Sequence, residues 1–460
     1  MNWRKAQLFL LHDLMGSDMR KAYDECLAVN AMTNGALRKL TEERLQSLLE
    51  QAAEQIPFYR KRVKGNAAAL SDFPIVSKAD LRTHFDDFMS PSLAREFRTR
   101  KRKAYSWVEV KSGGSTGVPA RVIHDRLTRD YGRAAKLFSN SLCGFPVGTP
   151  YIKLWGSLAD INRQRTSFSA RLFEFFQQAL LLNAFRLDSE RMQRYARIIN
   201  DSRLKHMMAY NDVLHQLALY CEQRQITMRP LATIMGCATL LTPDMRRRIE
   251  NVFGARIHNK YGTRECGEIA CQCSHGGMHI FNHWVRLEVV DKEGRPLAAG
   301  QAGRILVTML MNHSFPLIRY EIGDWGSTSE RGCACGSPLP LLENLEGRSI
   351  GLVVDTRGNY VTPHFIIHLI GVCYNPGSIR RFQFVQSGAV DYELLIETEA
   401  VEFRNLSPLL TKVADDLRVV LGEGARIRTT RVDEISESAS GKFQYVRNEY
   451  VKAMPIPGKE

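Results

Sequence analysis

Residues 108–125 read VEVKSGGSTGVPARVIHD, a glycine- and hydroxyl-rich loop between two short segments with strand character. Loops of this composition hold phosphate, because their small residues let backbone amides approach an anion closely. The P-loop of nucleoside triphosphatases has a lysine after its last glycine and runs directly into a helix. Here Gly117 is followed by Val118 and Pro119, and then by the β-like ARVIHD. The loop is therefore predicted to be a turn between strands.

The chain has the size and composition of a globular protein with more than one domain. Its 460 residues exceed the ~250–300 at which a single hydrophobic core stops growing. Hydrophobic residues make up 44% and charged residues 24%, without a low-complexity tract or an internal repeat. We therefore expect two or three domains.

The net charge of +14 fits polyanionic partners such as nucleotides, coenzyme A, nucleic acid or anionic lipid, and does not choose among them. The densest basic run is AREFRTRKRKAYSW at 94–107. Its simplest interpretation is a solvated face, and the alternatives are phosphate steering or a membrane-surface patch.

The N-terminal MNWRKAQLFLLHDLM is predicted to be an amphipathic helix, because its apolar run is too short to span a membrane and no small-residue cleavage site follows. No other segment reaches the ~18 uncharged apolar residues of a transmembrane helix. A cytoplasmic protein is expected, with peripheral membrane contact left open. Ten cysteines, five of them in two tight groups, favour metal binding over disulfides in such a reducing compartment.

Periodicity predicts alternating helices and strands. Residues 1–105 are expected to be mostly helical, and further helices are expected at 127–145, 168–183 and 187–199. A helix after LLTPDMRRRIENVFG has Thr242 as N-cap, Pro243 at its first position and Gly254 just past its end. VRLEVVD and GRILVTML, within 285–310, are predicted strands. The mixture indicates an α/β architecture.

Beyond residue 348 the pattern is that of a small α+β domain. RRFQFVQ, YELLIE and ARIRTTRV are predicted strands, and LSPLLTKVADDLRVVLG is a predicted helix. We therefore expect a large N-terminal domain over 1–348 and a small C-terminal domain over 349–460, which ends with SASGKFQYV.

The function of the glycine-rich loop is inferred from four further motifs, because on its own the loop could be a surface turn without function. In chain order they are NKYGTRECGE at 259–268, LIRYEIGDWG at 317–326, LEGRS at 345–349 and SGK at 440–442. Nucleotide-dependent acyl activation needs all of these residue types. It uses backbone amides for phosphate, one carboxylate for a metal ion, another for ribose hydroxyls, and cations for developing charge.

In order and wording, the five motifs resemble those of the adenylate-forming acyl-CoA synthetase superfamily, in its phenylacetate-CoA ligase and capsular polysaccharide biosynthesis (CapK)-like branch. The resemblance covers about residues 105–445. It implies a large adenylation domain of mixed sheets and helices, followed by a small mobile α+β domain. It also implies conversion of a carboxylic acid and MgATP to an acyl-adenylate and pyrophosphate, with acyl transfer to coenzyme A or an amine.

The same resemblance assigns site residues. Ser112, Gly113, Gly114, Ser115, Thr116 and Gly117 would hold the departing phosphates, Thr263 the α-phosphate and Glu265 a Mg2+ ion. Tyr261 and Gly262 would flank the adenine with Gly236 near it, Asp324 and Arg348 would hold the ribose, and Lys442 would bridge the attacking carboxylate and the α-phosphate.

Each assignment has a structural alternative: Asp324 could shape a turn, Glu265 could cap one, and Arg348 and Lys442 could be solvated surface charges. The chain also departs from the family pattern. Gly236, Cys237 and Ala238 replace a Gly-Glu pair near the adenine, Arg264 stands where a small hydroxyl residue is common, and Ile350 and Gly351 leave the hinge residue unassigned.

Two cysteine-rich segments predict a structural zinc site. CGEIACQCSHGGMHI at 266–280 and RGCACGSPLP at 331–340 can supply four soft or borderline ligands from two short loops. Relatives in the phenylacetate-CoA ligase branch have similar stretches. The selected ligands are Cys273, His279, Cys333 and Cys335, with His275 as the alternative. Free thiols and unliganded histidines are the structural alternative.

The acyl pocket is predicted from YIKLWGSLADI at 151–161 and MMAYNDVLH at 207–215, through Trp155, Gly156, Tyr210 and Cys237. The alternative is that this aromatic stripe belongs to the core. The predicted function is an ATP-dependent carboxylate ligase. One alternative is a catalytically idle ATP-binding scaffold, and the other is a basic zinc-containing nucleic-acid-binding protein. The nucleic-acid-binding alternative explains neither YGTRE nor SGK, so no nucleic-acid partner is expected.

Overall fold

The computed structural model describes residues 3–63, 69–99, 106–111, 120–155, 179–183, 189–348, 353–357, 360–361, 366, 369–370, 374, 379, 381–436 and 444–450. The chain divides into two units, Met1–Ile322 with Gly326–Leu345 and Gly323–Trp325 with Glu346–Glu460. The mixed α/β architecture predicted from the sequence is confirmed.

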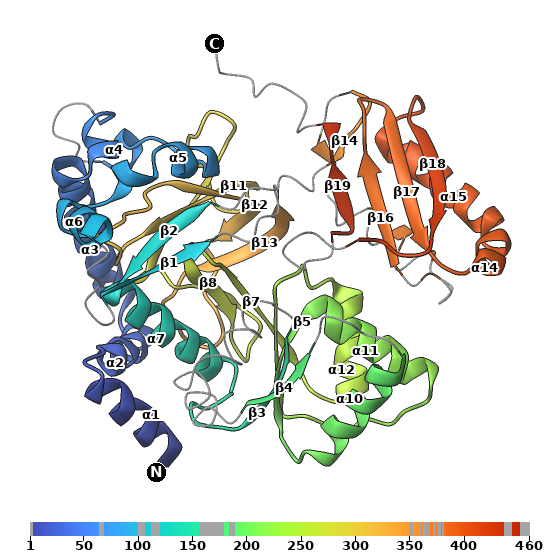
Figure 1. Cartoon of the computed structure of the whole chain (residues 1–460), viewed down its shortest axis with the longest axis horizontal. Helices are drawn as coiled ribbons and strands as arrows, with labels where there is room; N and C mark the ends of the chain where they lie inside the picture. Colours follow the sequence, from blue (N-terminus) through green and yellow to red (C-terminus); the bar gives the residue numbers. More distant parts are fainter. Residues whose placement is uncertain are drawn as a thin grey trace. The chain divides into compact units, whose positions relative to one another are not determined.

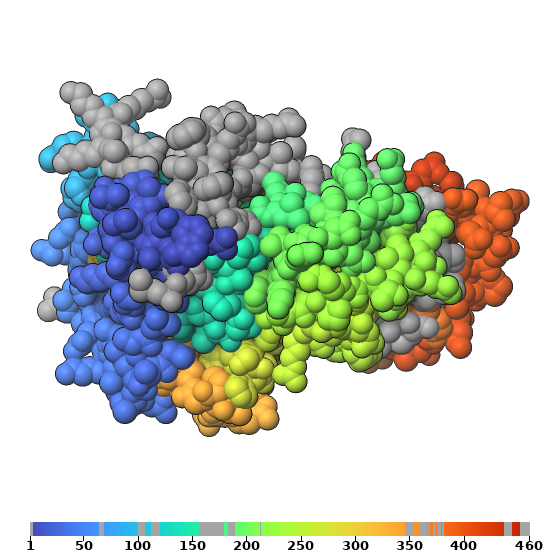
Figure 2. Space-filling view, turned by 90° about the horizontal axis from the view of Figure 1, so that it is seen from below, coloured from blue at the N-terminus to red at the C-terminus, as the bar shows by residue number. Residues whose placement is uncertain are grey.

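The larger unit begins with the predicted helices. They are α1 Trp3–Leu14, α2 Met19–Asn30, α3 Asn34–Gln55, α4 Pro57–Arg60, α5 Lys78–Thr83 and α6 Pro91–Thr99, with 3-10 turns η1 Leu70–Asp72 and η2 Phe85–Phe88. Thr33 caps α3, accepting a 3.2 Å hydrogen bond from the Ala36 amide. In the space-filling view the blue N-terminal helices lie beside the teal α7, Arg126–Leu142, on one face of this unit (Figure 2).

A two-stranded hairpin precedes α7. β1, Trp107–Lys111, pairs antiparallel with β2, Arg121–Asp125, so that Lys111 lies opposite Arg121. The prediction that the glycine-rich loop joins two strands is therefore confirmed. The loop residues 112–119 themselves lie outside the described residues.

An eleven-stranded sheet forms the centre of the fold, in the order β10-β11-β12-β13-β9-β8-β7-β6-β5-β3-β4 (Figure 1). Strands β3 to β7 run parallel, whereas β7, β8, β9 and β13 are paired antiparallel. The strands are β3 Tyr151–Trp155, β4 Ala179–Asn183, β5 His206–Tyr210, β6 Thr233–Cys237, β7 Ile257–Thr263, β8 Gly267–Gln272, β9 Met278–Ile280, β10 Val285–Val290, β11 Gly303–Met309, β12 Tyr320–Ser329 and β13 Leu341–Arg348.

Three helices pack on the parallel strands: α10 Ser189–Asp201, α11 Asn211–Gln223 and α12 Pro243–Phe253 (Figure 1). The predicted ends of α12 are confirmed. Thr242 accepts a 3.2 Å hydrogen bond from the Met245 amide, Pro243 opens the helix, and Gly254 adopts the left-handed φ of 59° that stops it. Buried side chains of these helices and strands form one continuous core.

The helix predicted over 168–183 is wrong at its C-terminal end. Ala179–Asn183 is the edge strand β4, paired in parallel with β3 from Ala179 to Asn183. A short continuous apolar run fits a parallel strand and a buried helix equally well by periodicity, and only pairing with β3 distinguishes them. The helix predicted at 187–199 is confirmed as α10.

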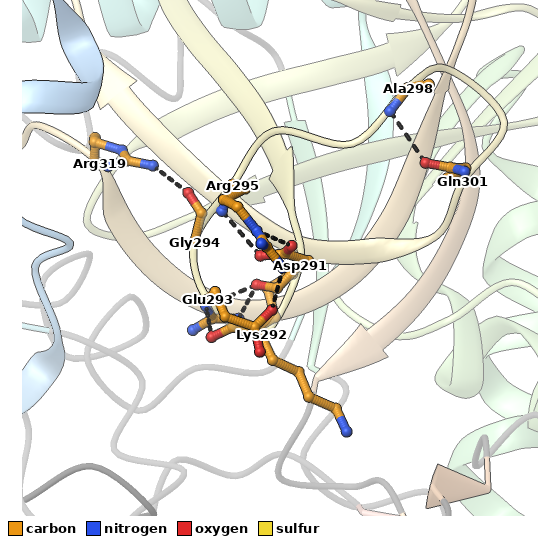
Figure 3. A network of polar contacts seen from close by, with 9 residues as sticks. Asp291, Lys292, Glu293, Gly294, Arg295, Ala298, Gln301 and Arg319 are labelled. Carbon is orange, nitrogen blue, oxygen red and sulfur yellow. Dashed lines mark hydrogen bonds and ion pairs between the residues drawn. The ribbon is translucent and has the colours of Figure 1, made fainter.

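A polar network fastens the connection between β10 and β11 (Figure 3). Asp291 accepts hydrogen bonds from the Arg295 amide at 2.9 Å and from its guanidinium at 2.8 Å. Directly before β12, the buried Arg319 donates to the Gly294 carbonyl at 2.8 Å and pairs with Glu288 at 3.3 Å. This connection is therefore held by specific polar contacts, in addition to the antiparallel pairing of β10 with β11.

The smaller unit contains the four-stranded sheet β18-β17-β16-β19. Its elements are β14 Val353–Val354, β15 Tyr360–Val361, β16 Arg381–Gln386, β17 Asp391–Glu397, α14 Ala400–Asn405, α15 Ser407–Leu421, β18 Arg426–Val432 and β19 Val446–Asn448. α15 buries Leu410, Val413, Leu417 and Leu421, one helical face, against this sheet. The predicted strands and long helix of this region are confirmed.

Among the helices of the described ranges, none combines the length and the apolar character that crossing a bilayer requires. The N-terminal segment is the predicted helix α1, which buries Leu8 and Phe9 while leaving Trp3 and Leu10 exposed.

Candidate functional site

The turn after β7 holds the predicted magnesium ligand. The Glu265 side chain is buried, and its Oε1 accepts a 3.1 Å hydrogen bond from the hydroxyl of Tyr320. The Lys78 ammonium lies 3.7 Å from the same oxygen. Thr263 Oγ1 accepts a 3.0 Å bond from the Cys266 amide and so closes the turn. Glu265 is thus held in one orientation by donors from distant parts of the chain.

The hairpin that flanks the glycine-rich loop is attached to this turn. His124 on β2 donates from Nε2 to the backbone oxygen of Glu265 at 2.7 Å. Burial lowers the pKa of His124, although the carbonyl contact opposes this change. The neutral imidazole therefore holds the stem of the predicted phosphate loop against the predicted metal ligand.

The predicted adenine wall lies at the carboxyl end of β6. Gly236 is buried, and a Cβ there would lie 2.0 Å from Asn211 Oδ1, so no side chain fits without displacing Asn211. The Asn211 amide donates to the Thr239 carbonyl at 2.6 Å. Ala238 has a φ of 75°, a left-handed conformation that non-glycine residues adopt with strain. The wall is therefore closely packed and conformationally constrained.

Tyr261 is buried on β7, and Gly262 is exposed beside it at an irregularity in the pairing with β8. Arg264 is exposed in the turn that follows. Tyr261 and Thr263 belong to β7 itself, and Glu265 lies in the turn that follows.

The predicted acyl-pocket residues gather at the carboxyl ends of neighbouring parallel strands. The rings of Trp155 and Tyr210 lie 4.3 Å apart, and Tyr210 is aligned with Cys237 on the next strand. Ligands of open α/β sheets bind at this edge, which favours a pocket over a core stripe. All three side chains are partly accessible. Gly156 lies outside the described residues.

The remaining predicted site residues are Asp324, Arg348, Lys442 and those of the glycine-rich loop. Asp324 is buried within β12, which begins at Tyr320. Arg348 ends β13, and its side chain is outside the described part of the structure. Lys442 and the loop residues Ser112, Gly113, Gly114, Ser115, Thr116 and Gly117 also lie outside it.

The four side chains selected as zinc ligands lie together. The ligand atoms of Cys273, His279, Cys333 and Cys335 are all within 4.8 Å of one another. Sγ of Cys273 lies 3.6 Å from that of Cys333, and Sγ of Cys335 lies 3.2 Å from His279 Nε2. These separations suit a tetrahedron of three sulfurs and one nitrogen around a single ion.

The surroundings of this cluster orient its ligands. His279 Nδ1 donates to the Leu339 carbonyl at 3.2 Å, which leaves the Nε2 lone pair directed at the cysteines. A Cβ on Gly277 would lie 2.6 Å from Cys333 Sγ, so only glycine allows this approach. The alternative ligand His275 is exposed and lies against Ser274 Oγ at 3.3 Å, outside the cluster.

Known proteins resemble this chain in sequence and in fold. Residues 353–449 match the family model of the CapK C-terminal domain. A solved structure of 2-hydroxyisobutyryl-CoA ligase, in the postadenylation state in complex with R3-HIB-AMP, superimposes with a TM-score of 0.67 and 19% identity, over 92% of this chain and 91% of that one. This chain has the fold of the adenylate-forming ligases.

Two curated relatives extend the similarity over most of the sequence. Phenylacetate-coenzyme A ligase of Thermus thermophilus is 25% identical over 403 residues, 80% of this chain and 83% of that ligase. Protein CapK of Staphylococcus aureus is 21% identical over 436 residues, 90% of this chain and 89% of CapK. The resemblance to the adenylate-forming superfamily, in its phenylacetate-CoA ligase and CapK-like branch, is confirmed.

Within the adenylate-forming fold, two residues that contact the candidate site were not predicted. Lys78 opens α5 in the helical N-terminal region, which carries none of the five motifs. His124 lies in ARVIHD, directly after the glycine-rich loop, where it follows the buried Val122 and Ile123 on β2. Both reach Glu265 through tertiary packing.

Proposed function

We propose that this chain is an ATP-dependent carboxylate ligase. It would convert an acid and MgATP to an acyl-adenylate and pyrophosphate, and then pass the acyl group to a thiol or an amine. The observation that supports this most is the 2.7 Å hydrogen bond between His124 and Glu265, since it holds the stem of the glycine-rich loop beside the metal-binding carboxylate. Phosphoryl chemistry requires this adjacency, because one metal ion contacts both the protein and the phosphates.

In this proposal Glu265 is the magnesium ligand. Among the described residues, Tyr320 and Lys78 contact the Glu265 side chain, both through Oε1, which leaves Oε2 for a hard cation. A single carboxylate completed by phosphate oxygens and water is the coordination that Mg2+ prefers. When bound, the ion would neutralise charge on the triphosphate. The Lys78 ammonium, 3.7 Å from Oε1, would help to orient the carboxylate for this purpose.

The remaining roles follow the family pattern. Residues 112–117 would hold the β- and γ-phosphates, Thr263 the α-phosphate, Tyr261, Gly262 and Gly236 the adenine, Asp324 and Arg348 the ribose, and Trp155, Gly156, Tyr210 and Cys237 the acyl group. We assign nucleotide and acid binding to 1–348, and to 349–460 the delivery of Lys442, whose ammonium would neutralise charge as the P–O bond forms.

The cysteine cluster would hold a structural zinc ion. Three sulfurs and one imidazole fill a tetrahedron and leave no open position for chemistry. The ion would join the loop at Cys273, which follows β8, to the loop at Cys333 and Cys335 between β12 and β13.

The proposal leaves two candidates for the acceptor of the acyl group. Coenzyme A is the first acceptor to test, because the Thermus thermophilus relative is a phenylacetate-coenzyme A ligase. An amine is the second, because the hinge residue departs from the family pattern. Acceptors are distinguished by whether the preformed acyl-adenylate yields a thioester with coenzyme A or an amide with an amine panel.

The proposal is tested by acid-dependent pyrophosphate release from MgATP, with hydroxylamine added to trap the adenylate as a hydroxamate. The acid panel spans aryl, fatty, amino and dicarboxylic acids. Glu265→Gln should lower the rate by about 100-fold, whereas the exposed Glu54→Gln on α3 should not change it. ATP binding without pyrophosphate release for any acid would favour the idle-scaffold alternative.

Lys442 separates the two half-reactions. Lys442→Ala should abolish adenylate formation yet spare acyl transfer from a supplied acyl-adenylate, since the lysine acts only where the P–O bond forms. Equal loss of both halves would contradict this role.

A further inference from the structure

Asn211 connects the ends of three neighbouring strands at the edge where the candidate acyl and adenine residues lie. It directly follows Tyr210, the last residue of β5, and is the first residue of α11. Its buried Nδ2 donates to the Thr239 carbonyl, beyond the end of β6, at 2.6 Å and to Asn259 Oδ1 on β7 at 3.4 Å. β5, β6 and β7 are adjacent in the sheet (Figure 1). One amide group therefore ties β5 to both of the strands that lie next in the sheet.

The contact at Thr239 holds a turn with a strained centre. Ala238 has a φ of 75°, and the Thr239 amide donates to the Cys237 carbonyl at 3.0 Å. A three-residue turn with a positive φ at its centre is rare and is strained for a residue that has a Cβ. Such a conformation persists only where the surrounding structure holds it. The 2.6 Å bond from Asn211 acts on the residue directly after the strained one.

The other end of the Asn211 amide is closely confined. Its Oδ1 is buried and accepts no hydrogen bond from the described residues. A Cβ on Gly236 would lie only 2.0 Å from this oxygen. A buried carbonyl oxygen without a donor is unfavourable, so the orientation of the amide satisfies the Thr239 carbonyl at the expense of Oδ1. This arrangement fits a side chain whose role is to hold the turn.

The turn carries a candidate acyl-pocket residue, Cys237. Cys237 is aligned with Tyr210 on β5, and the Tyr210 ring lies 4.3 Å from that of Trp155. All three side chains are partly accessible. A displacement of the turn would therefore move Cys237 relative to the two rings and change the space that the acid can occupy.

We propose that Asn211 is a positioning residue that sets the acid selectivity, because its amide holds the strained turn at Ala238 and so fixes Cys237 in the wall of the acyl pocket. This rests on the proposed function, and it adds a specificity-determining residue to the same site. Asn211 acts through the turn and does not itself contact the acid.

The kinetic test measures the KM for the acid and the KM for ATP separately, by pyrophosphate release with the best acid of the panel. Asn211→Ala should raise the KM for the acid by about 10-fold or more and change that for ATP by less than about threefold. It should also narrow the ratio of kcat/KM between the best acid and the next.

Asn200→Ala is the matched control. Asn200 on α10 also donates its Nδ2 to a backbone carbonyl, that of Thr227, at 3.0 Å, and it contacts none of the candidate site residues. Removing this amide should lower stability in the same way and leave both KM values unchanged. A merely structural role for Asn211 would make the two variants behave alike.

Ala238→Gly tests whether strain is what Asn211 opposes. Glycine adopts a φ of 75° without strain, so the turn would depend less on the amide. The double variant Asn211→Ala/Ala238→Gly should therefore recover part of the rise in the KM for the acid. A double variant with a KM no lower than that of Asn211→Ala would overturn the proposal.

Alkylation of Cys237 by iodoacetamide, followed by peptide mass spectrometry, tests the position of the turn without requiring turnover. Asn211→Ala should speed this reaction by about fivefold or more, because the turn that carries the thiol is no longer held. Asn200→Ala should not speed it. The buried Cys221 reports opening of the whole unit, and its reaction should stay at the wild-type rate.

The outcomes separate this inference from the proposed function. Pyrophosphate release with the same KM for the acid in Asn211→Ala and wild type would overturn the inference and leave the ligase activity standing. Faster alkylation of Cys237 without pyrophosphate release for any acid would support the hold on the turn and contradict the ligase activity. Unchanged alkylation of Cys237 in Asn211→Ala would overturn the inference whatever the activity.

Discussion

The imidazole of His124 and the backbone oxygen of Glu265, 141 residues apart in sequence, are joined by a 2.7 Å hydrogen bond. It connects the strand after the glycine-rich loop with the turn that presents a buried carboxylate. The glycine-rich loop is expected to hold phosphates and Glu265 a metal ion. The distance between the loop and this carboxylate therefore matters for any nucleotide chemistry at this site.

His124→Ala should lower acid-dependent pyrophosphate release by about 10- to 100-fold, because the hairpin loses its attachment to the Glu265 turn. His124→Gln can donate to the same carbonyl and should recover part of the rate. Circular dichroism of both variants checks folding. A rate in His124→Ala equal to that of the wild type would show that the contact does not position the loop.

Purified protein should contain about one equivalent of zinc, and Cys333→Ser should lower both the zinc content and the melting temperature. Gly277→Ala should act in the same direction through sterics alone, since its Cβ would lie 2.6 Å from Cys333 Sγ. Cys221→Ala, a buried cysteine outside the cluster, should keep its zinc. Elemental analysis that finds no zinc in the wild type would remove the metal site.

Gly236→Ala should weaken ATP binding and destabilise the fold by about 1–3 kcal/mol, because the added methyl overlaps Asn211 Oδ1. Removing that obstacle with Asn211→Ala in the same chain should recover part of the loss. A double-mutant cycle from chemical denaturation measures the coupling. Strictly additive effects of the two substitutions would argue against this contact as the cause.

Lys136→Met should stabilise the protein at pH 7, by at most about 3 kcal/mol. The folded-state pKa of Lys136 is about 8, below its usual 10.5, so the unfolded chain binds more protons between these values and stability rises with pH across them. The variant should lack this rise. Chemical denaturation at pH 7 and pH 10 checks this prediction. A variant that is less stable than the wild type at pH 7 would contradict it.

Acid should destabilise the larger unit through its buried histidines. Burial lowers the pKa of His283 to about 3, so the unfolded state binds more protons between 6.5 and 3, and stability falls as pH decreases through this window. Between pH 6.5 and 4.5 this one group accounts for about 2–3 kcal/mol. His283→Leu should flatten the pH dependence by that amount.

Local sequence patterns were sufficient to predict those elements whose structure depends on residues that are near one another in sequence. Thr242, Pro243 and Gly254 bounded one helix correctly, because caps act within one turn. The strands and long helix of the C-terminal region were also predicted correctly. The segment 179–183 was assigned to a helix, because a short apolar run does not reveal whether a parallel neighbour exists.

The motifs themselves indicated the candidate chemistry, since their residue types suit nucleotide-dependent acyl activation and their order resembles that of the adenylate-forming superfamily. They also selected four zinc-ligand candidates, Cys273, His279, Cys333 and Cys335, which the structure brings together. Tertiary structure alone decided what surrounds these groups. Lys78 and His124 meet Glu265 from elements far apart in the chain. Electrostatic interaction depends on distance in space and not on sequence separation, and sheet order and helix packing set that distance.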